Sequence, residues 1–159
     1  MIDDRLARLS LAENERGLSL QWRAGRAARD KHDESYAAVA AFEANGRALR
    51  PWSAGHIRAE KDSGGAVQIA WVRRARWGGD GWEGNDPPPS EESELYEVRI
   101  LDGATIKRRL TAATPGATYA LADQIADFGG AISGLSLEIA QISSRTGAGI
   151  TGAATFTML

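Results

Sequence analysis

The sequence has no cysteine, only two histidines, no excess of basic residues and no long apolar run. Without cysteine, neither a disulfide nor a thiolate metal site can hold the fold. Its 19 basic and 21 acidic residues nearly balance, whereas nucleic-acid binding needs a clear positive excess. The longest apolar runs are too short for a membrane span, and the acidic N-terminus lacks the apolar stretch of a secretory signal. We therefore expect a soluble protein made in a cytoplasm, with no nucleic-acid partner and no membrane insertion.

The first 50 residues contain too few apolar side chains to bury a core of their own. Helical spacing of Ile2, Leu6 and Leu9 predicts a short amphipathic helix or a fraying terminus over residues 2–16. Alternation over residues 18–22 predicts a strand, whereas the alanine-rich segment 36–42 is compatible with helix or strand. We interpret residues 1–50 as an N-terminal docking segment that becomes ordered on a partner.

Residues 51–159 form a series of short alternating segments separated by turns. This pattern is typical of an antiparallel β-sandwich, although an open barrel has the same periodicity. The segment 119–125 is either a strand or a strand that runs into a helical turn. The predicted strands cover residues 56–60, 67–72, 96–101, 106–110, 119–125, 135–139 and 153–158. The predicted core contains Trp71, Tyr96, Val98, Ile100, Leu137 and Ile139.

The order of landmarks along this region is more specific than its periodicity. A Trp lies on the second strand, Tyr-x-Val lies on the third, and LSLEIAQIS at residues 135–143 precedes Gly147-Ala148-Gly149. This order resembles the fibronectin type III plan, in which a buried Trp packs against the facing sheet and a late strand leads into a glycine-containing hairpin. We therefore expect an all-β, fibronectin type III-like antiparallel β-sandwich over residues 51–159.

A narrower resemblance covers residues 18–159. ALRPWSAGHIRA at residues 48–59 resembles the LRP-x-SP-x-HLRA stretch of the baseplate megatron, or host-specificity, proteins of gene transfer agents and related siphophages. The match continues through WRAGRA, IAWVRRAR, GDGW, ADFG and AQIS, which begin at residues 22, 69, 79, 126 and 140, and through Glu91–Glu94 with Tyr96 and Val98. The proteins of this family are much larger than 159 residues, and PPPS at residues 87–90 replaces a PLGE-like sequence.

The resemblance implies a structural, non-catalytic component of a virion tail tip, assembled in the cytoplasm of a bacterial host. Its implied role is an adaptor or spacer near the receptor-binding fibre. Its implied partners are other tail-tip or baseplate proteins and, beyond them, a host surface receptor or glycan. The family also implies a homotrimer.

The most distinctive candidate contact residues follow the second predicted strand. Arg73, Arg74 and Arg76 are expected to face Glu91, Glu92 and Glu94 across the glycine- and proline-rich loop 78–89. Such pairs pin strand register and protect an edge, or the arginines bind a partner. Trp77 and Trp82 either pack onto the sandwich, anchor an interface or stack on a sugar ring. The last possibility gives the alternative function, a carbohydrate-binding module.

Other motifs in the sequence do not support catalysis or cofactor binding. Both G-x-G-x-x-G spellings, at residues 79–84 and 147–152, lack the following helix that would hold a pyrophosphate. The acidic loop lacks EF-hand spacing, although its oxygens leave calcium binding open as the less favoured reading. No Gly-x-Ser-x-Gly nucleophile turn occurs, the glutamates at 91–94 fit a solvated face better than a glycosidase pair, and His56 has no evident acid partner. We expect no catalytic, cofactor or metal residues.

Overall fold

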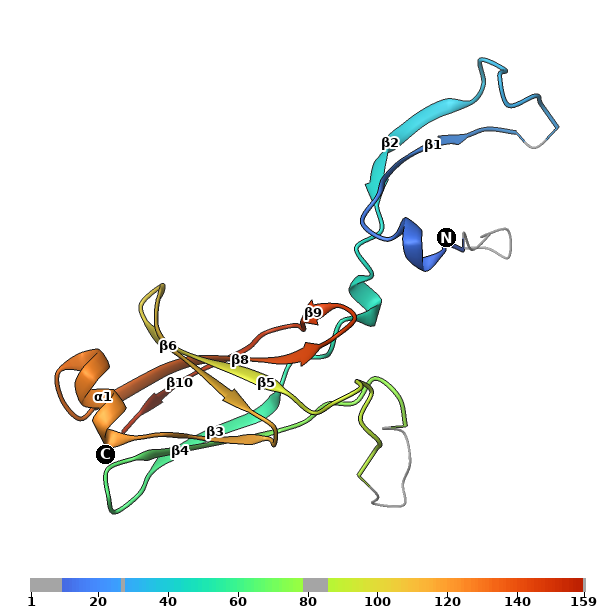
Figure 1. Ribbon diagram of the computed structural model, residues 1–159. Coiled ribbons are helices and arrows are strands. Elements are labelled where there is room, and N and C mark those ends of the chain that lie inside the picture. The colour runs from blue at the N-terminus through green and yellow to red at the C-terminus, as the bar shows by residue number, and fades with distance from the viewer. Residues whose placement is uncertain (1–9, 27, 79–85, 159) are drawn as a thin grey trace. The chain divides into compact units, whose positions relative to one another are not determined.

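The computed structural model describes residues 10–26, 28–78 and 86–158. The chain divides into two compact units, residues 1–48 and residues 49–159 (Figure 1). A short 3-10 turn, η2 (Arg47–Leu49), lies at the boundary between them. In the parts that the structure describes, no helix is long and apolar enough to cross a membrane.

Unit 1 is a single antiparallel hairpin. It consists of a 3-10 turn, η1 (Glu13–Glu15), and the strands β1 (Ser19–Ala24) and β2 (Ala37–Glu43). The segment that the sequence left open between helix and strand is thus a strand, because its backbone pairs with β1. The predicted helix over residues 2–16 falls mostly on residues 1–9, outside the described part of the chain. None of the unit 1 residues whose burial is described is fully buried.

Unit 2 is a sandwich of two antiparallel sheets. One sheet has the order β3-β4-β7, and the other has the path β10-β8-β5-β6 with β9 paired to β8. Two separate sheets exclude a barrel and confirm the expected fibronectin type III-like sandwich. The strands are β3 (Gly55–Lys61), β4 (Val67–Val72), β5 (Tyr96–Asp102), β6 (Thr105–Ala112), β7 (Gly116–Tyr119), β8 (Gly134–Ser143), β9 (Gly147–Ala148) and β10 (Gly152–Thr157).

The core lies between the two sheets. Trp71 on β4 meets Tyr96 on β5 edge to face, with ring centroids 5.0 Å apart, a geometry that stabilises beyond simple burial by about 0.5–1.5 kcal/mol. All six side chains assigned to the core by alternation are buried. The other buried hydrophobic side chains of the core cluster are Val67, Ile69, Ala112, Tyr119, Ile132, Leu135 and Met158.

The segment 119–125 is a strand end that runs into a helix, as in the second of its two predicted alternatives. β7 ends at Tyr119 and the helix α1 (Leu121–Phe128) begins almost at once. The fully buried Gln124 fixes the helix, since its amide donates to the carbonyl oxygens of Gly65 and Tyr119 and accepts the Ile132 N–H. Gly129 ends the helix in the left-handed conformation, at φ 80°.

An ionic cluster attaches α1 to the edge strand β6. Asp127 accepts two hydrogen bonds from the Arg108 guanidinium, at 2.6 and 3.0 Å, and one from the Tyr119 hydroxyl at 2.8 Å. Arg108 also pairs with Asp123 at 3.0 Å. The Arg108 hydrogen bonds hold the pKa of Asp127 below its ordinary value, with a further contribution from Tyr119. The helix is therefore held to the sandwich by charge as well as by burial.

The segment that leads into β3 is attached to the hairpin between β8 and β10. Arg50 donates two hydrogen bonds to the Ala148 carbonyl, and the Ile150 N–H donates to the carbonyl of the buried Pro51 at 2.9 Å. A Cβ on Gly149 would lie 2.7 Å from the Pro51 carbonyl oxygen, and one on Gly152 would lie 2.8 Å from the Ala54 carbonyl oxygen. The glycines at 149 and 152 are therefore needed for close backbone contact.

Candidate partner-binding surface

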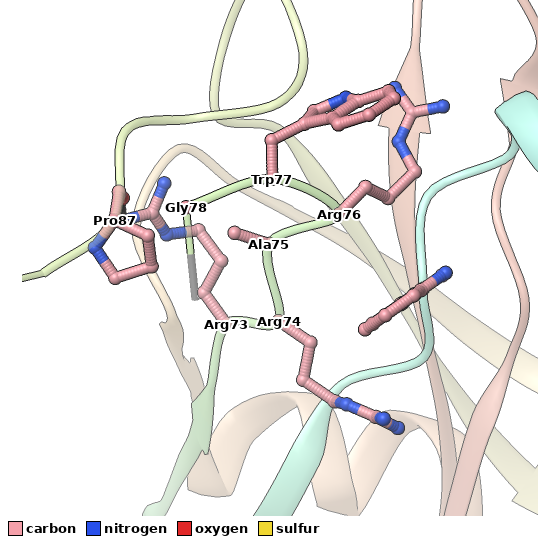
Figure 2. Close-up of a pocket in the computed structure, with 8 residues that line it drawn as sticks. Arg73, Arg74, Ala75, Arg76, Trp77, Gly78 and Pro87 are labelled. Atoms are coloured by element: carbon pink, nitrogen blue, oxygen red, sulfur yellow. Dashed lines mark hydrogen bonds between the residues drawn. The ribbon is translucent and has the colours of Figure 1, made fainter. Parts of the chain in front are cut away.

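The candidate site lies where the chain leaves β4 and turns out of the sheet. Residues 73–78 follow β4 outside any strand, and their side chains leave the chain in several directions (Figure 2). Figure 2 shows Arg73 reaching toward Pro87 and Arg74 leaving on the other side of the chain. The three arginines consequently have different environments and different roles.

Arg76 fastens three segments of unit 2 together. Its guanidinium pairs with the Glu91 carboxylate at 2.6 Å and donates to the carbonyl oxygens of Ser90 and Leu49. Its own backbone N–H donates to the Ser90 hydroxyl at 2.9 Å. Both partners of the ion pair are almost completely buried, so this is a structural clamp rather than an exposed contact.

Arg73 is also enclosed. It pairs with Asp86 at 2.9 Å and donates to the Pro87 carbonyl at 2.6 Å, and its Nε lies 3.9 Å from Glu94. Glu94 in turn accepts a hydrogen bond of 2.7 Å from the Tyr96 hydroxyl. Burial, reinforced by the hydrogen bond to Glu94 and by its charge, raises the pKa of Tyr96. Arg73 therefore ties the loop to the core.

The expected pairing of arginines with glutamates is thus confirmed for Arg73 and Arg76. The expected pairing is wrong for Arg74 and for Glu92. Arg74 makes no ion pair with any described carboxylate, and Glu92 instead interacts with Ser144 and Arg145. The pKa of Glu92 lies below its ordinary value, chiefly because its own backbone N–H donates to the carboxylate, with smaller contributions from the Ser144 hydrogen bond and the Arg145 charge.

Arg74 stacks on an aromatic ring. Its guanidinium lies 5.1 Å from the centroid of Trp52, and the stem of its side chain runs past Gly55. Trp52 is 42% exposed and was not among the residues that the sequence singled out. Its position directly after Pro51, outside any alternating segment, was the one available signal that its ring faces outward.

Trp77 is 67% exposed, so its interpretation as a side chain packed on the sandwich is wrong. Trp82 falls outside the described residues. Trp77 and Trp52 line one hollow of about 380 Å³ together with Arg74 and Pro87. A second hollow, of about 400 Å³, is lined by His56, Arg58, Ala70, Trp71 and Val72.

The other candidate residues form no reactive constellation in the described part of the chain. His56 is an exposed residue on the edge strand β3, with φ 47°, beside the irregularity in the pairing of β3 with β4. No group of three or more His, Asp or Glu side chains suited to a metal ion occurs among the described residues. Residues 79–85, which carry most of the loop considered for calcium, are not described.

Comparisons with known proteins return structural alignments of low sequence identity. No family model and no curated protein matches the chain. Domains d3–d4 of the rat CD45 extracellular region align with a TM-score of 0.47 and 8% identity, over 99% of this chain and 72% of that one. The FN5 domain of Drosophila Lar aligns with a TM-score of 0.37 and 12% identity, over 68% of this chain and 96% of that one.

Proposed function

We propose that this protein is a structural component of the tail tip or baseplate of a phage or gene transfer agent. It acts as a non-catalytic adaptor or spacer near the fibre that binds the host receptor. The proposal starts from the resemblance of residues 18–159 to the megatron proteins. Its assembly state is a homotrimer, and its partners are other tail-tip proteins.

One observation carries the proposal. Two of the segments that resemble the family, residues 48–59 and 69–76, converge on the same end of unit 2. Arg74 from the second segment stacks on Trp52 from the first, and Arg76 donates to the Leu49 carbonyl. The residues of the resemblance thus build one connected surface, as a shared attachment site requires.

The properties of the two units suit an adaptor. Unit 2 has a single continuous core and charged clamps at both ends, Arg76 with Glu91 and Arg108 with Asp127, which favours a rigid spacer. The carboxylates beside the candidate surface, Glu91 and Glu94, are already bound to Arg76 and to Tyr96. They are therefore poorly placed to act as an acid–base pair.

The exposure of Trp77 favours one second candidate, a module that binds a host surface glycan. A glycan array probed with the purified chain separates the two functions. Binding that is lost in Trp77→Ala supports glycan recognition. If no glycan on the array binds the chain, the adaptor function remains the proposal.

The adaptor function is tested on particles. An epitope tag is placed on the protein in its producing host, tail particles are purified, and the tag is located by immunogold electron microscopy. We expect gold at the tail tip, with a tagged capsid protein as the control that places gold on the head. A protein that is expressed but absent from purified particles contradicts the proposal. Light scattering tests the trimer, for which we expect three times the chain mass of 17.0 kDa.

A further inference from the structure

We propose that the exposed side chains of Leu49, Trp52, Val72, Arg74 and Trp77, here called the tryptophan–arginine surface, bind an acidic and partly apolar segment of another protein. This inference rests on the proposed adaptor function and specifies the chemistry of its partner.

The surface contains four large apolar side chains that are exposed. Leu49, Trp52, Val72 and Trp77 are 44%, 42%, 52% and 67% exposed, and all belong to the segments that frame one end of unit 2. Trp52 and Trp77 line the same hollow, while Val72 ends β4 directly before the arginines. Exposed apolar clusters of this kind mark interaction sites, and tryptophan and arginine are enriched among the residues that dominate binding energy.

The charge on the surface is positive, and among the described residues no acidic side chain pairs with Arg74. Arg73 and Arg76 are neutralised by Asp86, Glu94 and Glu91. Arg74 makes no ion pair with any carboxylate that the structure describes, and the exposed Arg58 lies beside Val72 in the adjoining hollow. An incoming carboxylate would gain this cation without competing against a described acid, so an acidic partner is favoured.

Arg74 is already held in one orientation before any partner arrives. Its stem passes 3.5 Å from the place that a Cβ on Gly55 would occupy, and its guanidinium rests on Trp52. A planar guanidinium that is stacked in this way still presents its edge donors for two-point binding of a carboxylate. Less side-chain entropy is lost on binding when the group is held in advance.

The same surface is poorly suited to a carbohydrate. Sugar hydroxyls need acceptors as well as donors, yet among the described residues that line the hollow the only polar side chains, apart from the Trp indole N–H groups, are arginines, which solely donate. One face of Trp52 is occupied by Arg74, which removes it as a stacking platform for a sugar ring. A protein segment with carboxylate and apolar side chains matches what the surface offers.

The experiment selects ligands on the purified full-length chain from an mRNA-displayed library of random peptides. In each round, peptides that also bind the double variant Arg74→Glu, Trp77→Ala are removed. We expect enriched peptides to place Asp or Glu beside Leu, Phe or Trp. Their Kd, measured by fluorescence anisotropy, should weaken about tenfold in Trp77→Ala and in Arg74→Gln, and less in Arg74→Lys, which keeps the charge.

Lys107 and Phe128 supply matched controls, because Lys107 lies 5.7 Å from the Phe128 ring and forms a second cation–aromatic pair at the α1 end of unit 2. Lys107→Gln and Phe128→Ala should leave the Kd unchanged. All substituted side chains are at least partly exposed, and circular dichroism verifies that each variant keeps the fold.

Three outcomes would overturn the proposal: no enrichment over the counter-selected variant, enrichment of basic or uncharged peptides, or an array showing that anionic glycans bind and that Trp77→Ala abolishes the binding. The test is independent of the tail particle. Peptide binding at this surface by a chain that is absent from particles would refute the adaptor function only, and a chain present at the tail tip that binds no acidic peptide would refute this inference only.

Discussion

The two units of this protein are both built from antiparallel strands, but among the residues whose burial is described, fully buried side chains occur in unit 2 alone. In unit 1, β1 and β2 pair along their length, yet none of the residues whose burial is described is fully buried. In unit 2, two sheets face each other, and residues such as Val98, Ile100 and Ile139 have no exposed surface. Backbone pairing is therefore present in both units, whereas a second sheet facing the first is described for unit 2 alone.

The difference shows what sustains each unit. An isolated two-stranded hairpin is at best marginally stable in water, because neither of its faces is covered. Unit 2 removes a continuous cluster of aliphatic and aromatic side chains from water, which supplies the main favourable term in folding. The interpretation of residues 1–50 as a docking segment stays a prediction, and the predictions below test the contrast between the two units.

The largest effect is expected from removing matched aliphatic side chains in the two units. Ile100→Ala should lower the free energy of unfolding of unit 2 by about 2–5 kcal/mol, because it leaves a cavity between the sheets. Leu20→Ala, at a half-buried position on β1, should change it by less than about 0.5 kcal/mol. Urea unfolding followed by tryptophan fluorescence measures both. Comparable losses would contradict the contrast between the units.

The second prediction concerns the buried clamp at one end of the sandwich. Glu91→Ala should destabilise unit 2 by about 3 kcal/mol, because it leaves the Arg76 guanidinium enclosed without its carboxylate. The neighbouring Glu92→Ala, at an exposed position, is the control and should leave the unfolding midpoint nearly unchanged. The midpoint is read by thermal denaturation with circular dichroism. Equal effects of the two substitutions would show that the clamp does not stabilise unit 2.

The third prediction tests whether residues 50–54 belong to the sandwich. Gly152→Ala should cost about 1–3 kcal/mol, since the new methyl group would meet the Ala54 carbonyl and backbone would have to shift. Gly130→Ala, with nothing within 4 Å, should be neutral or stabilise by about 0.4–1 kcal/mol. Chemical denaturation of both variants gives the comparison. A neutral Gly152→Ala would mean that the entry segment is not held against the hairpin.

The sequence predicted the parts of the molecule that depend on local pattern. The alternation around Trp71 and Tyr96 gave strands and core positions, and opposite charges on either side of a loop gave the pairing of Arg73 and Arg76 with glutamates. Such features follow from a periodicity of two and from charge, both of which a single sequence displays.

Features that depend on contacts between segments far apart in the sequence could not be predicted. Gly149 and Gly152 read as hairpin glycines, whereas they are required because Pro51 and Ala54 approach them. The exposed stack of Arg74 on Trp52 likewise joins residues on different segments. The helix α1 was only one of two alternatives for residues 119–125, and the burial of Gln124, whose amide hydrogen-bonds to Gly65, Tyr119 and Ile132, decides between the two.

The smallest expected effect is a difference between the two units in how their carboxyl groups make stability depend on pH. Arg108 lowers the pKa of Asp127 in unit 2, and a hydrogen bond from the Ser35 side chain lowers the pKa of the partly exposed Asp33 in unit 1. A carboxyl with a lowered pKa stabilises the fold above its ordinary value near 3.8, and this contribution is lost as the pH falls through the lowered value. Only Asp127 belongs to a cooperative core, so only its titration should move the thermal midpoint of unit 2.

Thermal midpoints measured from about pH 6 down to about pH 2 test this last expectation. Asp127→Asn should lower the midpoint at the upper end of that range and flatten its fall in acid, since the Arg108 interaction is already gone. Asp33→Asn should leave the curve superimposable on that of the unaltered protein, because the turn that it caps belongs to unit 1 and not to the core of unit 2. A shift of equal size in both variants would require unit 1 to fold cooperatively with unit 2, and the contrast drawn between them would then be wrong.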